Sequence, residues 1–172
     1  MTYQAELKSS ELSEQYLTFV LDQDLFATGI DQVHEVLELT QITRVPRSPA
    51  YLRGVINLRG SVVPVVDLRL QFGMSAIEPT VDTCIIIFEV QIDGEDIVLG
   101  ALADSVQEVL EIGRSDLEPP PSLGTRINVD FITAMAKHGN DFLVVLDINQ
   151  VFSGDQLSEM SMAQGQLDAS NE

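Results

Sequence analysis

The sequence predicts an all-β fold made of two tandem copies of a strand-rich unit, and two observations support this. First, residues 31–39 (DQVHEVLEL) align without gaps on residues 104–112 (DSVQEVLEI) and are identical at six of nine positions. Second, the segments around each copy are short apolar runs or alternate with period two, which is typical of β-strands. Repetition at a fixed offset indicates a repeated structural unit. Because a unit of about 65 residues barely forms a core of its own, the copies should pack tightly on each other.

The first half should begin with a polar arm and continue as short strands. Leu17, Phe19 and Leu21 alternate with their neighbours at the period of a strand, and Asp31 can cap a short helical turn. The expected order is a flexible arm at 1–15, a strand at 17–21, a turn at 22–24, a return strand at 25–30, a helical turn at 32–35 and a strand at 36–39.

The segment 54–69 differs from its surroundings in turn chemistry and charge. Residues 57–60 (NLRG) predict a turn, because Asn and Gly can take positive φ. The apolar run 62–66 that follows predicts a strand buried on both faces. Pro64 has no N–H to give to a ladder, so this strand should lie at a sheet edge or carry a bulge.

The second copy begins after a connection at 73–82. Residues 84–88 take the place of the first strand, and residues 144–148 take the place of 65–68. The second copy lacks the Asn-Leu-Arg turn and carries an insertion at 113–130 with three consecutive prolines, which excludes a central strand there. The expected domains are an arm at 1–15, a first subdomain at 16–83, a second subdomain at 84–153 and a disordered acidic tail at 154–172.

Charge and composition exclude several classes of protein. The net charge of −18 would repel nucleic acid and anionic membrane surfaces. No apolar run approaches the roughly 20 residues of a membrane span, and the polar start lacks the apolar region of a signal peptide. The one cysteine, Cys84, cannot form an internal disulfide, which fits a reducing compartment. We therefore expect a soluble cytoplasmic protein that binds no nucleic acid and does not insert into a membrane.

Positive charge is concentrated in residues 40–77, which we call the arginine segment. It holds five of the nine basic residues, all arginines, and Asp67 is its only acid. The arginines are Arg44, Arg47, Arg53, Arg59 and Arg69. They could form a solvated loop face or a contact patch for an acidic protein partner. The exclusive use of arginine favours the contact patch, because the planar guanidinium suits pairing with carboxylates at interfaces.

The sequence predicts no catalytic residue, metal or cofactor. His34, His138 and Cys84 do not have the spacing of metal ligands, and no phosphate-binding loop or nucleophile elbow is present. Cys84 opens an apolar run and should be a small buried hydrophobe. Asp67 and Asp147 occupy matching places in the two copies. A carboxylate dyad is one interpretation, but an Asp at the end of a strand more often bonds the backbone of the next turn.

Five motifs follow one another along residues 15 to 153 and together resemble the CheW family of bacterial chemotaxis coupling proteins. They are Tyr16-Leu-Thr-Phe, Gly29-Ile-Asp-x-Val-x-Glu-Val, Arg44-Val-Pro, Gly54-Val-Ile-Asn-Leu-Arg-Gly and Pro64-Val-Val-Asp-Leu-Arg. The resemblance implies two small five-stranded β-barrels packed side by side. It also implies an adaptor without catalysis that joins the cytoplasmic tip of chemoreceptors to the regulatory domain of the histidine kinase CheA, which is itself similar to CheW.

The resemblance also assigns residues to the two partners. The receptor-facing residues would be Val33, Glu35, Val36, Arg53, Gly54, Asn57 and Arg59. The kinase-facing residues would be Leu39, Val45, Thr83, Cys84 and Ile85.

We expect an amphipathic receptor helix to lay an apolar stripe over Val33 and Val36, with Arg53 and Arg59 at its rim. The competing interpretation of the two valines is core packing, because the second copy has valine at both equivalent positions. At Gly54 a small residue would allow close approach of a partner, so Gly54→Asp should abolish coupling with little loss of folding.

Three other functions remain open at this point. The same domain occurs in coupling proteins of type IV pilus and biofilm signalling, which the motifs do not separate from chemotaxis. A small-barrel ligand sensor would need a deep apolar pocket inside one unit. A hydrolase using Asp67 and Asp147 would need the two carboxylates within a few ångströms, and barrels placed side by side should keep them apart.

Overall fold

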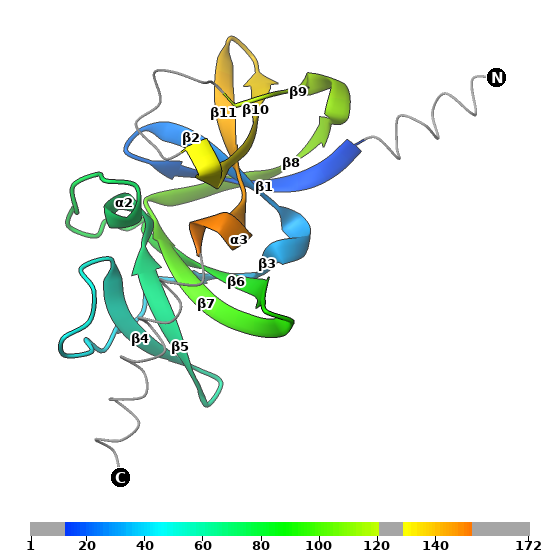
Figure 1. Ribbon diagram of the computed structural model, residues 1–172. Coiled ribbons are helices and arrows are strands. Elements are labelled where there is room, and N and C mark those ends of the chain that lie inside the picture. The colour runs from blue at the N-terminus through cyan, green and yellow to red at the C-terminus, as the bar shows by residue number, and fades with distance from the viewer. Residues whose placement is uncertain (1–12, 121–128, 153–172) are drawn as a thin grey trace.

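The computed structural model describes residues 13–120 and 129–152, which form two β-sheets with short helical turns around them (Figure 1). The all-β prediction is confirmed. Residues 13–15, which were expected to belong to a flexible arm, are part of the first strand, and residues 1–12 lie outside the described residues. The predicted tail at 154–172 and the middle of the predicted insertion lie outside the described residues.

The first sheet has the strand order β8-β1-β2-β11-β10-β9. Its strands are β1 (Ser13–Leu21), β2 (Asp24–Gly29), β8 (Ser105–Gly113), β9 (Leu117–Glu118), β10 (Ile132–His138) and β11 (Asp141–Leu146). The second sheet has the order β3-β6-β7-β5-β4. Its strands are β3 (Val33–Glu38), β4 (Leu52–Leu58), β5 (Ser61–Asp67), β6 (Cys84–Ile92) and β7 (Glu95–Ala103). The described helical turns are η1 (Ile30–Gln32), α2 (Leu68–Gln71), η2 (Arg114–Asp116), η3 (Val129–Phe131) and α3 (Ile148–Val151).

The two sheets do not coincide with the expected subdomains 16–83 and 84–153. The second sheet is one continuous stretch, 33–103, whereas the first combines the strands of 13–29 with those of 105–146. After its first two strands, each copy crosses to the other sheet, and the β1–β2 and β6–β7 hairpins pair in parallel with strands of the opposite copy. Strands β1 to β5 of the first copy correspond to β6, β7, β8, β10 and β11 of the second. With these matches the two sheets have the same strand order, except that the first sheet also contains β9. Each sheet is therefore built from strands of both copies of the repeat.

Both sheets curl, but within the described residues neither closes into the expected five-stranded barrel. The opposite edges of the first sheet, β8 and β9, are separated in sequence by η2 alone, so they must approach each other. In the second sheet the loop after β3 returns to the other edge, where Thr43 exchanges two backbone hydrogen bonds with Val55 of β4. Closing each barrel would require its two edge strands to pair. In the first sheet the edges are instead connected by η2, and in the second sheet the loop after β3 bonds to β4.

The strand that contains Pro64 is not at an edge, because β5 lies between β4 and β7. Val55, which faces Pro64 across the β4–β5 pair, directs its backbone groups to Thr43 on the other side. No bond to β4 is therefore lost at Pro64, and the parallel pairing with β7 begins one residue later, at Val65. The predicted bulge is not on this strand either: the β4–β5 register shifts between Leu52 and Gly54 of β4, so both alternatives predicted for the strand of Pro64 are wrong.

Hydrophobic side chains form a core between the sheets and a smaller core inside each sheet. The interior of the first sheet contains Tyr16, Ala27, Ile112, Ala134, Ala136, Leu143 and Val145. The interior of the second contains Ile56, Val63, Val65, Ile85, Ile87 and Leu102. The cluster between the sheets, which we call the interface cluster, includes Leu17, Phe19, Leu21, Phe26, Ile86, Phe88, Leu99, Leu146, Ile148 and Phe152. Strands β5 and β6 thus bury both faces, as their continuous apolar runs predict.

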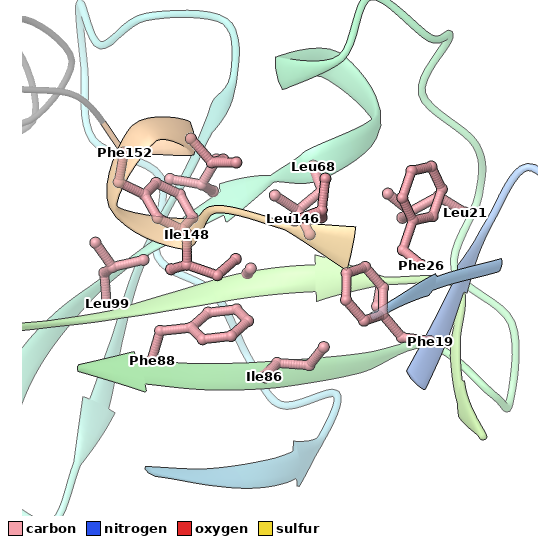
Figure 2. Packing of buried hydrophobic residues seen from close by; sticks show 14 of the residues in the cluster. Phe19, Leu21, Phe26, Leu68, Ile86, Phe88, Leu99, Leu146, Ile148 and Phe152 are labelled. Atoms are coloured by element: carbon pink, nitrogen blue, oxygen red, sulfur yellow. The ribbon is translucent and has the colours of Figure 1, made fainter. Parts of the chain in front are cut away.

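Figure 2 shows how the end of the described chain completes the interface cluster. Leu146 ends β11, Ile148 begins α3 and Phe152 follows α3, and the three side chains lie over Ile86 and Phe88 of β6. Phe152 has no exposed surface. In Figure 1, α3 lies between the two sheets. The sheets are therefore joined by a continuous apolar layer, as expected for two units too small to fold alone.

Candidate functional site

Arg59 and Gly60 form the tip of the β4–β5 hairpin. Both have positive φ, 50° and 88°, which is the pattern of a two-residue type I′ turn. The side-chain oxygen of Asn57 accepts a hydrogen bond from the Gly60 amide at 2.8 Å, which closes the turn. The predicted turn at 57–60 is confirmed, although positive φ falls on Arg59 and not on Asn57. This conformation directs Arg59 outward, where 64% of its side chain is exposed.

Glu35 holds the exposed Arg59 from β3, the strand at the opposite edge of the second sheet. Its carboxylate accepts hydrogen bonds from both terminal nitrogens of Arg59. These hydrogen bonds, together with the charge of Glu35, raise the pKa of Arg59 above its ordinary value. Because β3 and β4 are opposite edges of the second sheet, this pair is a further sign of the curl. The result is an oriented guanidinium, paired with a carboxylate, at the rim of the sheet.

Val33 and Val36 lie on the same face of β3, whereas Glu35, which pairs with Ile87 of the second sheet's interior, lies on the other face. Residues three apart normally face opposite sides of a strand. Here a bulge between Val33 and Glu35 restores the alignment, so that both valines pair with residues of the interface cluster, Phe88 and Ile86. Val33 is half-buried against that cluster, whereas Val36 is 41% exposed. Core packing therefore accounts for Val33, and Val36 is a surface side chain.

Gly54 is a structural residue. It is buried, its φ is 147°, and a Cβ at this position would lie 2.1 Å from the backbone oxygen of Thr43. The close approach that requires glycine is therefore made by the loop after β3 of the same chain. The expectation that Gly54→Asp would leave folding nearly intact is wrong, because backbone atoms block the side chain.

The arginine segment does not form one basic patch. Arg69 is buried, and Arg53, the extra residue at the β4 bulge, lies 3.3 Å from the Asp67 carboxylate. Arg44 and Arg47 are exposed in the loop after β3. Surface charge in this segment therefore comes from the loop arginines and Arg59.

Arg69 links the two sheets, a role that the sequence pattern did not reveal. Its guanidinium makes a bidentate contact with Asp104, with Nε–Oδ1 at 2.9 Å and Nη2–Oδ2 at 2.8 Å, and also donates to the Ser75 carbonyl at 2.9 Å. Asp104 also accepts from the amide of Asp22 in the β1–β2 turn at 2.8 Å. Burial acts to raise the pKa of Asp104, but the bonds from Arg69 and Asp22 outweigh burial and lower it. The one sequence feature that could have drawn attention to Asp104 is that it aligns with Asp31 in the repeat.

Asp67 and Asp147 both cap short helices. The Asp67 carboxylate accepts from the Arg69 amide at 3.0 Å at the start of α2, and Asp147 accepts from the Gln150 amide at 3.4 Å at the start of α3. The prediction that each ends a strand and bonds the next turn is confirmed. Each carboxylate has its own structural task, and the strands that they follow belong to different sheets.

The five kinase-facing residues of the resemblance do not form one exposed patch. Ile85 lies inside the second sheet, and Val45 and Cys84 belong to the interface cluster, so all three are buried. Leu39 and Thr83 are partly exposed. Burial, with a contribution from the nearby Asp104 charge, raises the pKa of the Cys84 thiol to about 11. Cys84 is thus a buried hydrophobe, as predicted, and only Leu39 and Thr83 reach the surface.

Three further properties of the described residues bear on function. The interiors of both sheets are filled by side chains, and the pocket beside Arg53, Asp67 and Asp104 has room for about 20 Å³, roughly one water molecule. Within the described ranges no three His, Cys, Asp or Glu side chains gather as a metal site. None of the described helices is long and apolar enough to span a membrane.

Comparison with known proteins identifies the family and the fold. Residues 15–156 match the family model of the CheW-like domain. The chemotaxis protein CheW of Bacillus subtilis is 33% identical over 148 residues, which cover 86% of this chain and 90% of that protein. The CheW of Treponema pallidum is 29% identical over 153 residues and 86% of each chain. The crystal structure of the scaffolding protein TtCheW from Thermoanaerobacter tengcongensis matches with a TM-score of 0.74 and 33% identity, covering 83% of this chain and 90% of that one. The chain therefore belongs to the family of CheW-like domain proteins.

Proposed function

We propose that this protein is a cytoplasmic chemotaxis adaptor that couples the tips of chemoreceptors to the histidine kinase CheA without catalysing a reaction. The observation that carries the proposal is the rim site of Arg59, Glu35 and Val36. It consists of a guanidinium oriented by Glu35 and an exposed apolar side chain on the same strand as Glu35, and an amphipathic helix can use both kinds of group. Membership of the CheW-like family and the similarity to a scaffolding protein support the same role.

At the receptor-facing surface, Val36 would contact the apolar stripe of a receptor helix. Arg59 would pair with an acidic or polar group at the rim of that helix, and Asn57, exposed on the same hairpin, would offer its side chain beside it. Glu35 orients Arg59 before the partner arrives, which reduces the ordering that binding requires. Val33 and Gly54 would act from beneath the surface, Val33 by supporting β3 and Gly54 by allowing the loop after β3 to pack on β4. Arg53 is held by Asp67 and would contribute at the margin.

At the kinase-facing surface, Leu39 and Thr83 would make direct contact with the regulatory domain of CheA. Val45, Cys84 and Ile85 would support this surface from below, because their side chains are buried. Leu39 and Thr83 would thus contribute directly to the affinity for CheA, and the three buried residues would maintain the shape of the surface. Substitutions in the buried group should therefore change stability and kinase binding together.

The structure gives less support to the other functions. In place of a hydrolytic pair, Asp67 and Asp147 cap separate helices. In place of a ligand pocket, both sheet interiors hold packed aliphatic and aromatic side chains. Neither observation favours a hydrolase or a small-barrel sensor.

The proposal is tested by reconstitution with a membrane-anchored receptor fragment and CheA from the same organism. We expect the protein to sediment with receptor-bearing vesicles, to bring CheA with it, and to change the rate of CheA autophosphorylation. Vesicles without receptor provide the control for non-specific adsorption. A protein that binds neither receptor nor CheA, at concentrations where a known CheW of the same organism binds both, would overturn the proposal.

A further inference from the structure

The connection between β5 and β6 carries the most exposed apolar side chain of the described residues. Val81 is fully exposed, at 100%, whereas the other large exposed apolar residues range from 41% to 49%. Single exposed apolar residues are common and need no function. Val81 differs from most such residues because hydrogen bonds with neighbouring threonines fix the backbone of its turn.

The turn around Val81 is closed by three hydrogen bonds. The Thr83 hydroxyl accepts from the Thr80 amide at 2.8 Å, the Thr80 hydroxyl accepts from the Asp82 amide at 3.1 Å, and the Thr80 carbonyl accepts from the Thr83 amide at 3.2 Å. Two threonine side chains are thus used to fix a turn that has only Val81 and Asp82 at its tip. Since valine is β-branched, its own side chain also has few rotamers to lose on binding.

The rest of the connection is anchored on the body of the protein. The Ser75 carbonyl accepts a hydrogen bond from the buried Arg69, and Ile77 and Pro79 line the small pocket beside Arg53 and Asp104. The connection therefore holds Val81 at a fixed place relative to the two sheets. Its charged side chains, Glu78 and Asp82, are both acidic and exposed.

We propose that the turn 80–83 is a preformed contact element whose Val81 side chain inserts into an apolar depression, rimmed by basic side chains, on the regulatory domain of CheA. The inference rests on the proposed function, because Thr83 both closes this turn and belongs to the proposed kinase-facing surface. The acidic flanks select a basic rim on the partner and disfavour an anionic membrane surface. Val81 then adds a fully exposed apolar side chain to a kinase-facing surface on which Leu39 is only partly exposed and three of the five residues are buried.

The test compares Val81→Ser with Val109→Ser, a matched valine that is 49% exposed on the edge strand of the other sheet. Binding to the CheA regulatory domain and to the receptor fragment is measured for both variants and for the wild type. Val81→Ser should weaken kinase binding about tenfold, the effect of losing one buried valine side chain, and leave receptor binding unchanged. Val109→Ser should bind both partners as the wild type does. Both variants should keep the melting temperature of the wild type.

A second variant separates the side chain from the turn that holds it. Thr80→Val removes the hydroxyl that accepts from Asp82 while Val81 remains, so kinase binding should fall by a few fold. Wild-type protein that does not bind the regulatory domain would refute the proposed function. Wild-type protein that binds, with Val81→Ser binding equally well, would refute this inference alone. Equal losses for Val81→Ser and Val109→Ser, or a loss confined to receptor binding, would also refute it.

Discussion

Arg59 and Gly54 belong to the same hairpin, yet they make opposite demands on their side chains. At Arg59 the side chain leaves the fold and is held only by Glu35. At Gly54 the backbone of Thr43 leaves no room for a side chain. The resemblance to the CheW family placed both in the receptor-facing group. What separated them was the path of the loop after β3, which no local pattern reports.

Arg59→Ala should weaken receptor binding about thirtyfold, the effect of losing an arginine anchor at an interface, while CheA binding changes less. The melting temperature should be nearly unchanged, because the side chain is exposed. Arg59→Lys should recover only part of the binding, since a point charge replaces a planar fork. Titration with receptor fragment and with CheA, beside melting curves, measures all three effects.

Arg114→Ala is the matched control for Arg59→Ala. Its side chain is 62% exposed and pairs with Glu14 on the other sheet. It should bind both partners normally. If Arg59→Ala lowers the melting temperature and weakens both partners equally, Arg59 stabilises the fold and is not a receptor contact.

Gly54→Asp should destabilise the fold by about 3 kcal/mol or more, because the new side chain meets backbone atoms in a strained conformation. Gly60→Ala provides the comparison. Gly60 also has positive φ, but a Cβ there meets no atom within 4 Å, so the cost should be only about 1 kcal/mol. Urea unfolding of both variants measures the difference, and equal losses would show that the contact with Thr43 has no energetic weight.

Cys84 should react slowly with a thiol reagent at pH 8 in the native protein and rapidly in urea. Burial raises the pKa of its thiol to about 11, so both access and the thiolate fraction are small. Absorbance of the released chromophore follows the reaction in both conditions. Native labelling as fast as that in urea would mean that β6 opens readily at its start.

At the scale of elements, the apolar patterns located strands better than they located their neighbours. The predicted strands at 17–21, 62–66 and 84–88 lie within β1, β5 and β6. The helical turn expected at 32–35 occurs earlier, as η1, because Val33 already pairs with Phe88 in β3. Residues 144–148 do take the place of 65–68, because each segment contains the end of a strand, a capping Asp and the first residue of a short helix. Side-chain period fixes which residues are extended, whereas ladder partners decide where an element begins and ends.

The hairpin of β4 and β5 shows the same limit. Pro64 excluded a ladder bond at its own nitrogen, and the prediction of an edge strand followed from that exclusion. The strand can nevertheless be central. At Pro64 the β4–β5 pair makes no backbone hydrogen bond, and the pairing of β5 with β7 begins only at Val65, so the absent N–H of Pro64 removes no bond to either neighbour. A proline forbids one hydrogen bond, and it does not exclude a neighbouring strand elsewhere along its length.

At the scale of the whole molecule, the repeat predicted two similar units but not the exchange of strands between them. The repeated segments begin at Asp31 and Asp104, which are the places where the chain crosses between sheets. Identity between the copies shows that the crossings are alike. It does not show whether the strands of each copy pair with one another or with strands of the other copy, because both arrangements have the same local sequence pattern.

The Arg69–Asp104 pair should make the joining of the sheets sensitive to acid. The pKa of Asp104 is lower in the folded protein, so its contribution is complete above the unfolded value of about 3.9 and is lost as the pH falls through the folded value. Asp104→Asn should cost about 2 kcal/mol or more at pH 7, because it leaves Arg69 buried with a weakened partner. The cost should shrink at pH 3, which is below the unfolded pKa, because protonation of Asp104 in the unfolded wild-type protein then favours unfolding.

Urea unfolding of the wild type and of Asp104→Asn at both pH values tests this expectation. Glu14→Gln, which weakens the exposed pair with Arg114, is the control and should have almost no effect at either pH. An Asp104→Asn cost that is the same at pH 3 and pH 7 would show that the charge of Asp104 does not contribute to the joining.

The strand exchange also sets the order in which the protein can be completed on the ribosome. The hairpin β1–β2 emerges first, but its partners β8 and β11 are made about a hundred residues later, a delay on the order of ten seconds at ordinary rates of translation. During that time the second sheet, a continuous stretch of chain, can form while the hairpin keeps two unpaired edges. Neighbouring ribosomes on one message carry the same hairpin and the same late strands. Chains made side by side should therefore yield a fraction of intertwined dimers, each hairpin completing the sheet of the other chain.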